Sequence, residues 1–286
     1  MPDTSLSTLV RSAVQRLADA GVADPVVDAE LLAGHVLSAG RGEVQAALVR
    51  GSAMTEQDAA AFESLVARRA AREPLQHITG TAPFRHRELA VGPGVFVPRP
   101  ETETVVQFAI DALLNAAEPE PIGIDLGTGS GAIAIAMATE VPHARVFAAE
   151  LSADAFPWAQ RNTEGIENLT LVNEDLATAF ADLEGSASVV ISNPPYVPDA
   201  AVPRDVEVRL FDPAMALYGG EDGLDVVRVL STRALALLRP GGLLVIEHGE
   251  LQGAQIRQLL ESDGWRAAAT HRDLTLRDRS TTAIRP

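Results

Sequence analysis

The 286-residue chain contains no cysteine and no lysine. Without cysteine it cannot form a disulfide, a thiolate nucleophile or a cysteine-ligated metal site. Its six histidines are scattered, with no pair at the spacing of metal ligands, so the sequence predicts no metal site. All 23 basic residues are arginines, a bias more typical of genome composition than of function.

Positive charge and long apolar runs are also scarce. The 39 acidic residues give a net charge of −16, and the sequence lacks the basic stripe with which nucleic-acid binders usually neutralise phosphates. No apolar run reaches the roughly 18 residues needed to span a bilayer. The N-terminus also lacks the basic-then-apolar order of a signal peptide. We therefore expect a cytoplasmic protein that contacts neither membrane nor nucleic acid directly.

The length suggests about two domains, and residues 1–75 read as the first. Apolar residues recur there at helical spacing, and Thr55 is placed to cap a long helix. Near the end of that helix Arg68, Arg69 and Arg72 complement the helix dipole, an interpretation that we favour over phosphate binding. With ten acidic and seven basic residues, this segment is expected to be an all-helical bundle for substrate docking.

The rest of the chain predicts an α/β fold. Residues 76–100 indicate a short β-hairpin linker, and strands and helices alternate over residues 101–286. The expected strands are 122–126, 144–150, 169–172, 187–192 and 242–247, followed by strand-like segments at 265–272 and 280–284. Such alternation is typical of a parallel, doubly wound, Rossmann-like sheet.

A glycine-rich loop follows the first expected strand and opens a helix. It contains Gly127, Thr128, Gly129, Ser130 and Gly131. Glycines let the backbone approach a ligand closely, and the helix start offers free N–H groups. The spacing differs from that of dinucleotide-binding folds, and the lysine of a P-loop is absent.

Acidic residues stand at or after the ends of the first three strands. Asp125 is placed to face a cationic sulfonium, Glu150 to accept hydrogen bonds from ribose hydroxyls, and Asp175 to accept one from an adenine amine. Each also has a structural interpretation, as a turn residue or a helix cap. Together with the glycine loop, the three acids indicate an S-adenosylmethionine (AdoMet) site.

Asn193-Pro194-Pro195-Tyr196 closes the fourth strand of the sheet. Each proline fixes φ at about −65° and lacks an N–H, so the turn is stiff and its carbonyls are free to accept hydrogen bonds. An amide beside an aromatic ring on such a turn suits the binding of a planar NH₂ group; the alternative is a proline-rich strand exit with a solvated tyrosine. Ligands bind at the carboxyl ends of such strands, so Asn193 is expected beside the donor methyl group.

With these features the chain resembles the PrmC/HemK family of protein-glutamine methyltransferases, which act on class 1 peptide chain release factors. The resemblance covers nearly the whole chain. It rests on PLQHITG at 74–80, VPRPETE at 97–103, DLGTGSGAIAIA at 125–136, SNPPYVP at 192–198, DGLDVVR at 222–228, EHGELQG at 247–253 and RDLTLRDR at 272–279. The NPPY motif alone is shared with adenine-N6 methyltransferases, whereas the combination is specific.

The resemblance implies AdoMet contacts along Gly127–Gly131, at Glu150, near Asp175–Leu176 and at Asn193. It also implies that Asn193–Tyr196 hold the glutamine of the release factor's Gly-Gly-Gln loop. It further suggests a monomer.

The sequence departs from the family's pattern at three positions. Glu150 stands where aspartate is commoner, Leu176 where an aromatic residue is often found, and Arg85 at a position that varies and is often aromatic. Weaker stacking on adenine is therefore expected, while the NPPY chemistry is untouched.

The expected mechanism depends on positioning. The Asn193 side-chain oxygen and the Pro194 carbonyl would accept the two amide hydrogens of the glutamine, so that the nitrogen lone pair points at the methyl group. Tyr196 would pack on the amide plane and exclude water. Arg99 and Glu101 either order the donor site from the linker or form a structural pair.

Two rival functions and one related function are weighed against this interpretation. An adenine-N6 nucleic-acid methyltransferase would use the same turn on a flipped base, but the charge of −16 argues against it. A non-catalytic AdoMet-binding scaffold would not need the intact NPPY motif. A glutamine methyltransferase with a different protein acceptor is also compatible with the sequence.

Overall fold

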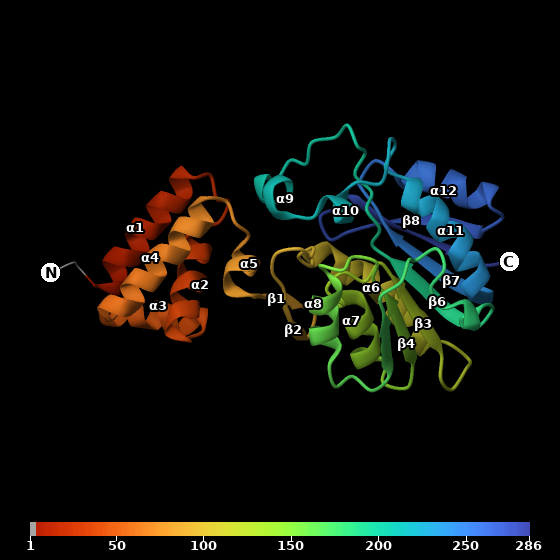
Figure 1. The fold of residues 1–286 in the computed structure, drawn as a ribbon, viewed down its shortest axis with the longest axis horizontal. Helices are drawn as coiled ribbons and strands as arrows, with labels where there is room; N and C mark the ends of the chain where they lie inside the picture. The colour runs from red at the N-terminus through yellow and green to blue at the C-terminus, as the bar shows by residue number, and fades with distance from the viewer. Residues whose placement is uncertain (1–3) are drawn as a thin grey trace. The chain divides into compact units, whose positions relative to one another are not determined.

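The computed structural model describes residues 4–286, which divide into two compact units (Figure 1). The helical unit contains the chain up to Gly80 together with residues 204–211, and the sheet unit contains residues 81–203 and 212–286. From the sequence we had grouped residues 204–211 with the second domain. Among the described residues, no helix is both long enough and apolar enough to cross a membrane.

The helical unit packs around an apolar core of its own. Its helices are α1 (Leu6–Asp19), α2 (Pro25–Leu37), α3 (Arg41–Arg50), α4 (Glu56–Ala70), α5 (Leu75–Thr79) and α9 (Val206–Phe211). Leu17, Leu32 and Phe62 are fully buried in this core. The expected cap of α4 is confirmed, because Thr55 Oγ1 accepts a hydrogen bond of 3.1 Å from the Asp58 N–H.

The three arginines near the end of α4 all have carboxylate partners. Arg68 pairs with a neighbouring glutamate. Arg69 is buried and donates to Asp28 at 2.7 Å and to Glu207 of α9 at 2.9 Å. Arg72 lies beyond the helix end, at φ +70°, and donates to both oxygens of Glu207. Arg68 and Arg69 thus lie in the last turn of α4 as expected, Arg72 lies beyond it, and all three arginines form ion pairs as well.

A seven-stranded sheet in the order β5-β4-β3-β6-β7-β9-β8 forms the second unit. Its strands are β3 (Ile122–Leu126), β4 (Arg145–Ala149), β5 (Leu169–Val172), β6 (Ala187–Ser192), β7 (Leu238–Glu247), β8 (Arg266–Arg272) and β9 (Asp278–Ile284). The first five run parallel, and β9 and β8 add an antiparallel edge. The chain order reverses between β3 and β6, which is where ligands bind in sheets of this type.

Helices cover both faces of this sheet (Figure 1). One apolar layer includes α6 (Pro100–Leu114) and α7 (Ala132–Glu140), with α8 (Phe156–Thr163) beside α7. The other includes α11 (Asp225–Leu237) and α12 (Gly253–Ser262). A short helix, α10 (Ala214–Leu217), precedes α11. The expected α/β, Rossmann-like architecture with an N-terminal helical bundle is therefore confirmed.

The hairpin is shorter than the sequence suggested. It consists of β1 (Thr81–Phe84) and β2 (Arg87–Ala90). Residues 77–79, which we expected in the hairpin, instead form the end of α5. Pro74 provides the physical reason: it starts a new helical turn, and its carbonyl accepts from the N–H groups of His77 and Ile78.

Residues 204–211 are predicted to depend on Glu207 for their attachment, because no residue of α9 is buried. We expect Glu207→Gln to cost about 2–3 kcal/mol of local stability, since it leaves buried Arg69 with one carboxylate and Arg72 with none. Hydrogen exchange of residues 204–211 measures this directly. Glu221→Gln, at an exposed position, is the matched control. Unchanged exchange in Glu207→Gln would contradict the prediction.

Candidate active site

The carboxyl ends of β3, β4, β6 and β7 lie side by side because these strands are parallel neighbours. The register pairs Leu126 with Ala149 and Ser192 with Ile246. The residues that follow these strands therefore leave the sheet at one edge. Ser192 Oγ also donates to the Leu126 carbonyl, which ties the end of β6 to that of β3.

The glycine loop adopts a backbone that other residues rarely take. Gly127, Gly129 and Gly131 have φ values of 78°, 59° and 87°. Side chains at Gly127 or Gly129 would meet no neighbouring atom, so the space beside the backbone is open there. The loop is tied to the end of β4, because the N–H groups of Gly127 and Thr128 both donate to the Ala149 carbonyl. Such a loop suits close approach of a ligand to its backbone.

Asp125 organises the loop from within the sheet. Its Oδ2 accepts hydrogen bonds from the Thr128 hydroxyl and from the Ala134 N–H in the first turn of α7. Its Oδ1 makes no hydrogen bond although the residue is fully buried. Burial raises the pKa of Asp125 to about 7, against the opposing effect of its two hydrogen bonds. A buried oxygen without a partner fits a site that is completed by a polar or cationic ligand.

Glu150 follows β4 and is also buried. Its two oxygens accept from the N–H groups of Gly129 and Ser152, both at 2.7 Å. Burial raises its pKa, and these hydrogen bonds oppose the rise. Each carboxylate oxygen has a second lone pair, so Glu150 can hold the glycine loop and still accept from a ribose hydroxyl.

Asp175 and Leu176 stand in a turn after β5. Asp175 is exposed, and its Oδ1 accepts from the Ala177 N–H at 2.9 Å. This contact matches the turn-residue alternative for Asp175 and leaves its other oxygen without a side-chain contact. Leu176 is half-buried and packs against the apolar layer of α11 and α12.

The NPPY turn is packed tightly against a second glycine-containing segment. Pro194 is buried, and Asn193, Pro195 and Tyr196 are half-buried. A side chain at Gly219 would overlap the Pro195 carbonyl. The Val197 N–H donates to Leu217 at 2.8 Å and the Gly219 N–H donates back to Val197 at 2.9 Å, so the exit of the turn is also bridged.

Two further residues that sequence reasoning did not assign support the turn. Gly223 has φ of +76°, and a side chain there would overlap the Tyr196 carbonyl. Gln252 Nε2 donates to that same carbonyl at 2.9 Å, while its Oε1 accepts from the Gly249 N–H. Gly223 lies in the DGLDVVR motif and Gln252 in the EHGELQG motif. These two motifs were the signal in the sequence from which the residues could have been found. Burial raises the pKa of Tyr196 to about 12, so its hydroxyl stays protonated.

Arg99 does not pair with Glu101. Its guanidinium donates to Asp212 at 2.7 Å and lies over the Phe96 ring, 4.8 Å from the ring centre. The expected Arg99–Glu101 pair is therefore wrong, and Arg99 pairs instead with a carboxylate that follows α9 in sequence.

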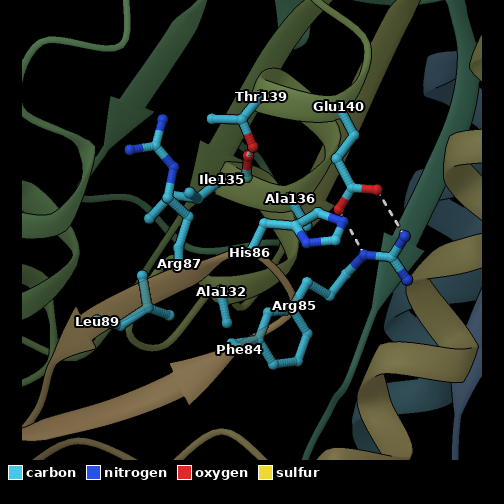
Figure 2. Close-up of a pocket in the computed structure, with 10 residues that line it drawn as sticks. All are labelled: Phe84, Arg85, His86, Arg87, Leu89, Ala132, Ile135, Ala136, Thr139 and Glu140. Carbon is cyan, nitrogen blue, oxygen red and sulfur yellow. Dashed lines mark hydrogen bonds and ion pairs between the residues drawn. The ribbon is translucent and has the colours of Figure 1, made fainter. Parts of the chain in front are cut away.

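Arg85 fixes the hairpin turn to the sheet unit (Figure 2). Its guanidinium forms two hydrogen bonds with Glu140 at the end of α7 and a third with Gln107 of α6, and its backbone has φ of +50°. A small pocket opens here between the hairpin and α7, and it contains none of the site residues expected from the sequence. We therefore assign Arg85 and this pocket to the packing of the hairpin.

Comparison with known proteins matches both units. Residues 8–80 match the PrmC N-terminal domain, and residues 88–228 match the methyltransferase small domain. A release factor glutamine methyltransferase from Streptomyces coelicolor is 51% identical over 96% of both chains. A 4-amino-L-phenylalanine/4-methylamino-L-phenylalanine methyltransferase from Streptomyces pristinaespiralis is 36% identical over 98% of this chain and 95% of its own.

A solved structure shares the fold of a large part of this chain. The catalytic domain of hMettl16, in complex with the MAT2A 3'UTR hairpin 6, aligns with a TM-score of 0.53 and 16% identity. The alignment covers 68% of this chain and 75% of that one. At this identity the likeness concerns the fold alone. The family matches make the chain an AdoMet-dependent methyltransferase.

AdoMet binding is predicted to strengthen as the pH rises through 7. Below its pKa of about 7 Asp125 is largely protonated, and a sulfonium favours the ionised form. Affinity should increase several-fold between pH 6 and 8, by at most about tenfold per pH unit, with release of a proton on binding. Calorimetry in buffers of different ionisation enthalpy measures both effects.

Two controls isolate Asp125 in this titration. Asp125→Asn should remove the pH dependence and the proton release. S-adenosylhomocysteine, which has the same amino group but no sulfonium charge, should show a shallower dependence with the unaltered protein. An equal slope for Asp125→Asn and the unaltered protein would refute the role of Asp125.

Proposed function

The chain belongs to the release factor glutamine methyltransferase family, and we propose that it transfers the AdoMet methyl group to the side-chain amide nitrogen (N5) of the Gly-Gly-Gln glutamine in class 1 peptide chain release factors. The reaction would take place in the cytoplasm, with the protein acting as a monomer. The helical unit, residues 1–75 in the sequence-based division, docks the release factor, and the sheet unit carries the chemistry.

The observation that carries this proposal is the immobilised NPPY turn at the switch point of the sheet. Packing at Gly219 and Gly223 fixes the backbone of Pro195 and Tyr196. A rigid turn presents the Asn193 amide and the Pro194 carbonyl at a constant separation, as the recognition of a planar NH₂ group requires. The glycine loop leaves the sheet at the same edge, on the neighbouring strand.

The cofactor cradle follows from the contacts of the loops. The backbone of Gly127 and Gly129 faces open space, Asp125 retains one oxygen without a hydrogen bond, and Glu150 retains lone pairs for ribose hydroxyls. Asp175 and Leu176 are assigned to the adenine end. AdoMet, when bound, supplies an electrophilic methyl group on a sulfonium.

The residues of the turn then make a poor nucleophile reactive. An amide lone pair is delocalised into its carbonyl; acceptance of both N–H groups by Asn193 Oδ1 and the Pro194 carbonyl favours a pyramidal nitrogen. This nitrogen forms the bond to the methyl carbon as the carbon–sulfur bond breaks with its electron pair on sulfur. The nitrogen's extra proton passes to water, so no basic side chain is needed. Positioning of this kind is worth on the order of 7–11 kcal/mol.

A second acceptor class deserves a direct test because of the Streptomyces pristinaespiralis relative. That protein is named for 4-amino-L-phenylalanine and 4-methylamino-L-phenylalanine, whose acceptor groups are aromatic amines. The same pair of oxygens would accept both hydrogens of the primary amine of 4-amino-L-phenylalanine, and one of them would accept the single N–H hydrogen of the methylated form. Adenine-N6 methylation of nucleic acid is disfavoured by the net charge of −16.

We expect labelled methyl from AdoMet to reach a purified release factor and not its Gly-Gly-Gln→Gly-Gly-Ala variant. 4-Amino-L-phenylalanine and an adenine-containing oligonucleotide are assayed beside them. Label on the release factor alone supports the proposal. Label on the variant, or transfer only to one of the other two acceptors, would overturn it.

Asn193→Ala should abolish most turnover without emptying the cofactor site. We expect kcat to fall by about 10²–10³-fold and the AdoMet Kd to change by less than about threefold, because the lost oxygen acts mainly in the transition state. Steady-state kinetics and calorimetry measure the two quantities. Near-normal kcat in this variant would remove Asn193 from the mechanism.

A further inference from the structure

Glu247 occupies a position that the proposed mechanism does not yet use. It is the last residue of β7, and β7 pairs in parallel with β6 so that Ile246 lies opposite Ser192. The next residues along each strand are Glu247 and Asn193. The two side chains therefore start from adjacent points at the edge of the sheet where the NPPY turn begins.

The Glu247 carboxyl is buried without an ion pair of its own. Its side chain is 1% exposed, and its Oε2 makes no hydrogen bond. The nearby Arg279 is engaged elsewhere, because it pairs with Asp273 at 3.3 Å and donates to the His248 carbonyl. Burial of a carboxyl is costly to stability unless it is hydrogen-bonded or paired. Packing alone does not explain a glutamate here.

Asn193 and Thr102 are both neighbours of this carboxyl. Each of them lowers the pKa of Glu247 and so favours its charged form, while Thr102 Oγ1 and Glu247 Oε2 have no hydrogen-bond partner.

The chemistry of an amide explains why such a neighbour matters. The side chain of Asn193 carries an oxygen acceptor and an NH₂ donor at similar positions, and only the oxygen can accept a hydrogen from an acceptor NH₂ group. A half-turn of the amide would replace attraction by repulsion between two NH₂ groups. An ionised carboxylate can only accept hydrogen bonds, so it selects one of the two orientations.

We propose that Glu247 is a positioning residue for Asn193: its carboxylate accepts from Asn193 Nδ2 and thereby directs Asn193 Oδ1 toward the acceptor nitrogen. This role rests on the proposed function of the NPPY turn, but it holds for any acceptor with an NH₂ group. Glu247 takes no proton from the substrate. It acts only through the orientation of Asn193.

The charges around Glu247 should make the orientation of Asn193 depend on pH. Burial raises its pKa to about 7; Thr102, Arg279 and Asn193 oppose the rise, and Glu101 adds to it. Tyr196 also faces this group but stays neutral, with a pKa of about 12. Orientation of Asn193 should therefore improve as the pH rises through about 7.

The test compares Glu247→Gln with the unaltered protein. Glutamine has the same shape but adds a donor, so both amide orientations of Asn193 become possible. We expect kcat for the release factor to fall by about 10- to 100-fold while its KM and the AdoMet Kd stay within about twofold, as for a misplaced catalytic group. The rise of kcat with pH should disappear in this variant and persist in Glu247→Asp. Glu261→Gln, at an exposed position of α12, is the control.

A second measurement needs no acceptor. In ¹⁵N-labelled protein, the side-chain NH₂ signal of Asn193, assigned with Asn193→Ala, should titrate with a midpoint near pH 7 and should not titrate in Glu247→Gln. Failure of the unaltered protein to label a release factor would count against the proposed function alone. Normal kcat in Glu247→Gln, or an Asn193 signal that titrates equally in both proteins, would overturn the positioning role.

Discussion

The close approach of two backbone carbonyls to two glycines is the contact on which the rest of the site depends. The carbonyls of Pro195 and Tyr196 occupy the space that side chains at Gly219 and Gly223 would need. Neither proline of the turn can donate a hydrogen bond, so this packing, with Gln252, replaces the ladder contacts that would normally hold a strand exit. Because these carbonyls are held in place, the backbone that carries the Asn193 amide is rigid.

Buried carboxyl groups form a second common element of the sheet edge. Asp125, Glu150 and Glu247 stand at the carboxyl ends of β3, β4 and β7, and burial raises the pKa of each. In a purely structural sheet these groups would be a liability. Under the proposed function, a bound cation and a ribose would compensate Asp125 and Glu150 for the loss of water, whereas the Asn193 amide of the protein itself would compensate Glu247.

Much of this architecture is predictable from the sequence, because the structure that the local sequence patterns favour is also the one that long-range packing stabilises. The glycine loop, the alternating strands and the NPPY turn each have a pattern whose physical cause is local. Arg99 shows where such reasoning fails: its partner is Asp212, more than a hundred positions away, and not the neighbouring Glu101. The roles of Gly223 and Gln252 likewise depend on loops that meet only after the sheet has formed. Periodicity carries no information about such pairings.

The Glu207 ion pairs affect the order in which the two units can fold during synthesis of the chain. The helices up to Gly80 leave the ribosome early, yet the carboxylate that joins Arg69 lies 138 positions later. Until residue 207 has been made, Arg69 has only Asp28 as a carboxylate partner and Arg72 has none. The first unit to be translated is thus completed only after the NPPY turn exists, so the two units cannot mature strictly one after the other.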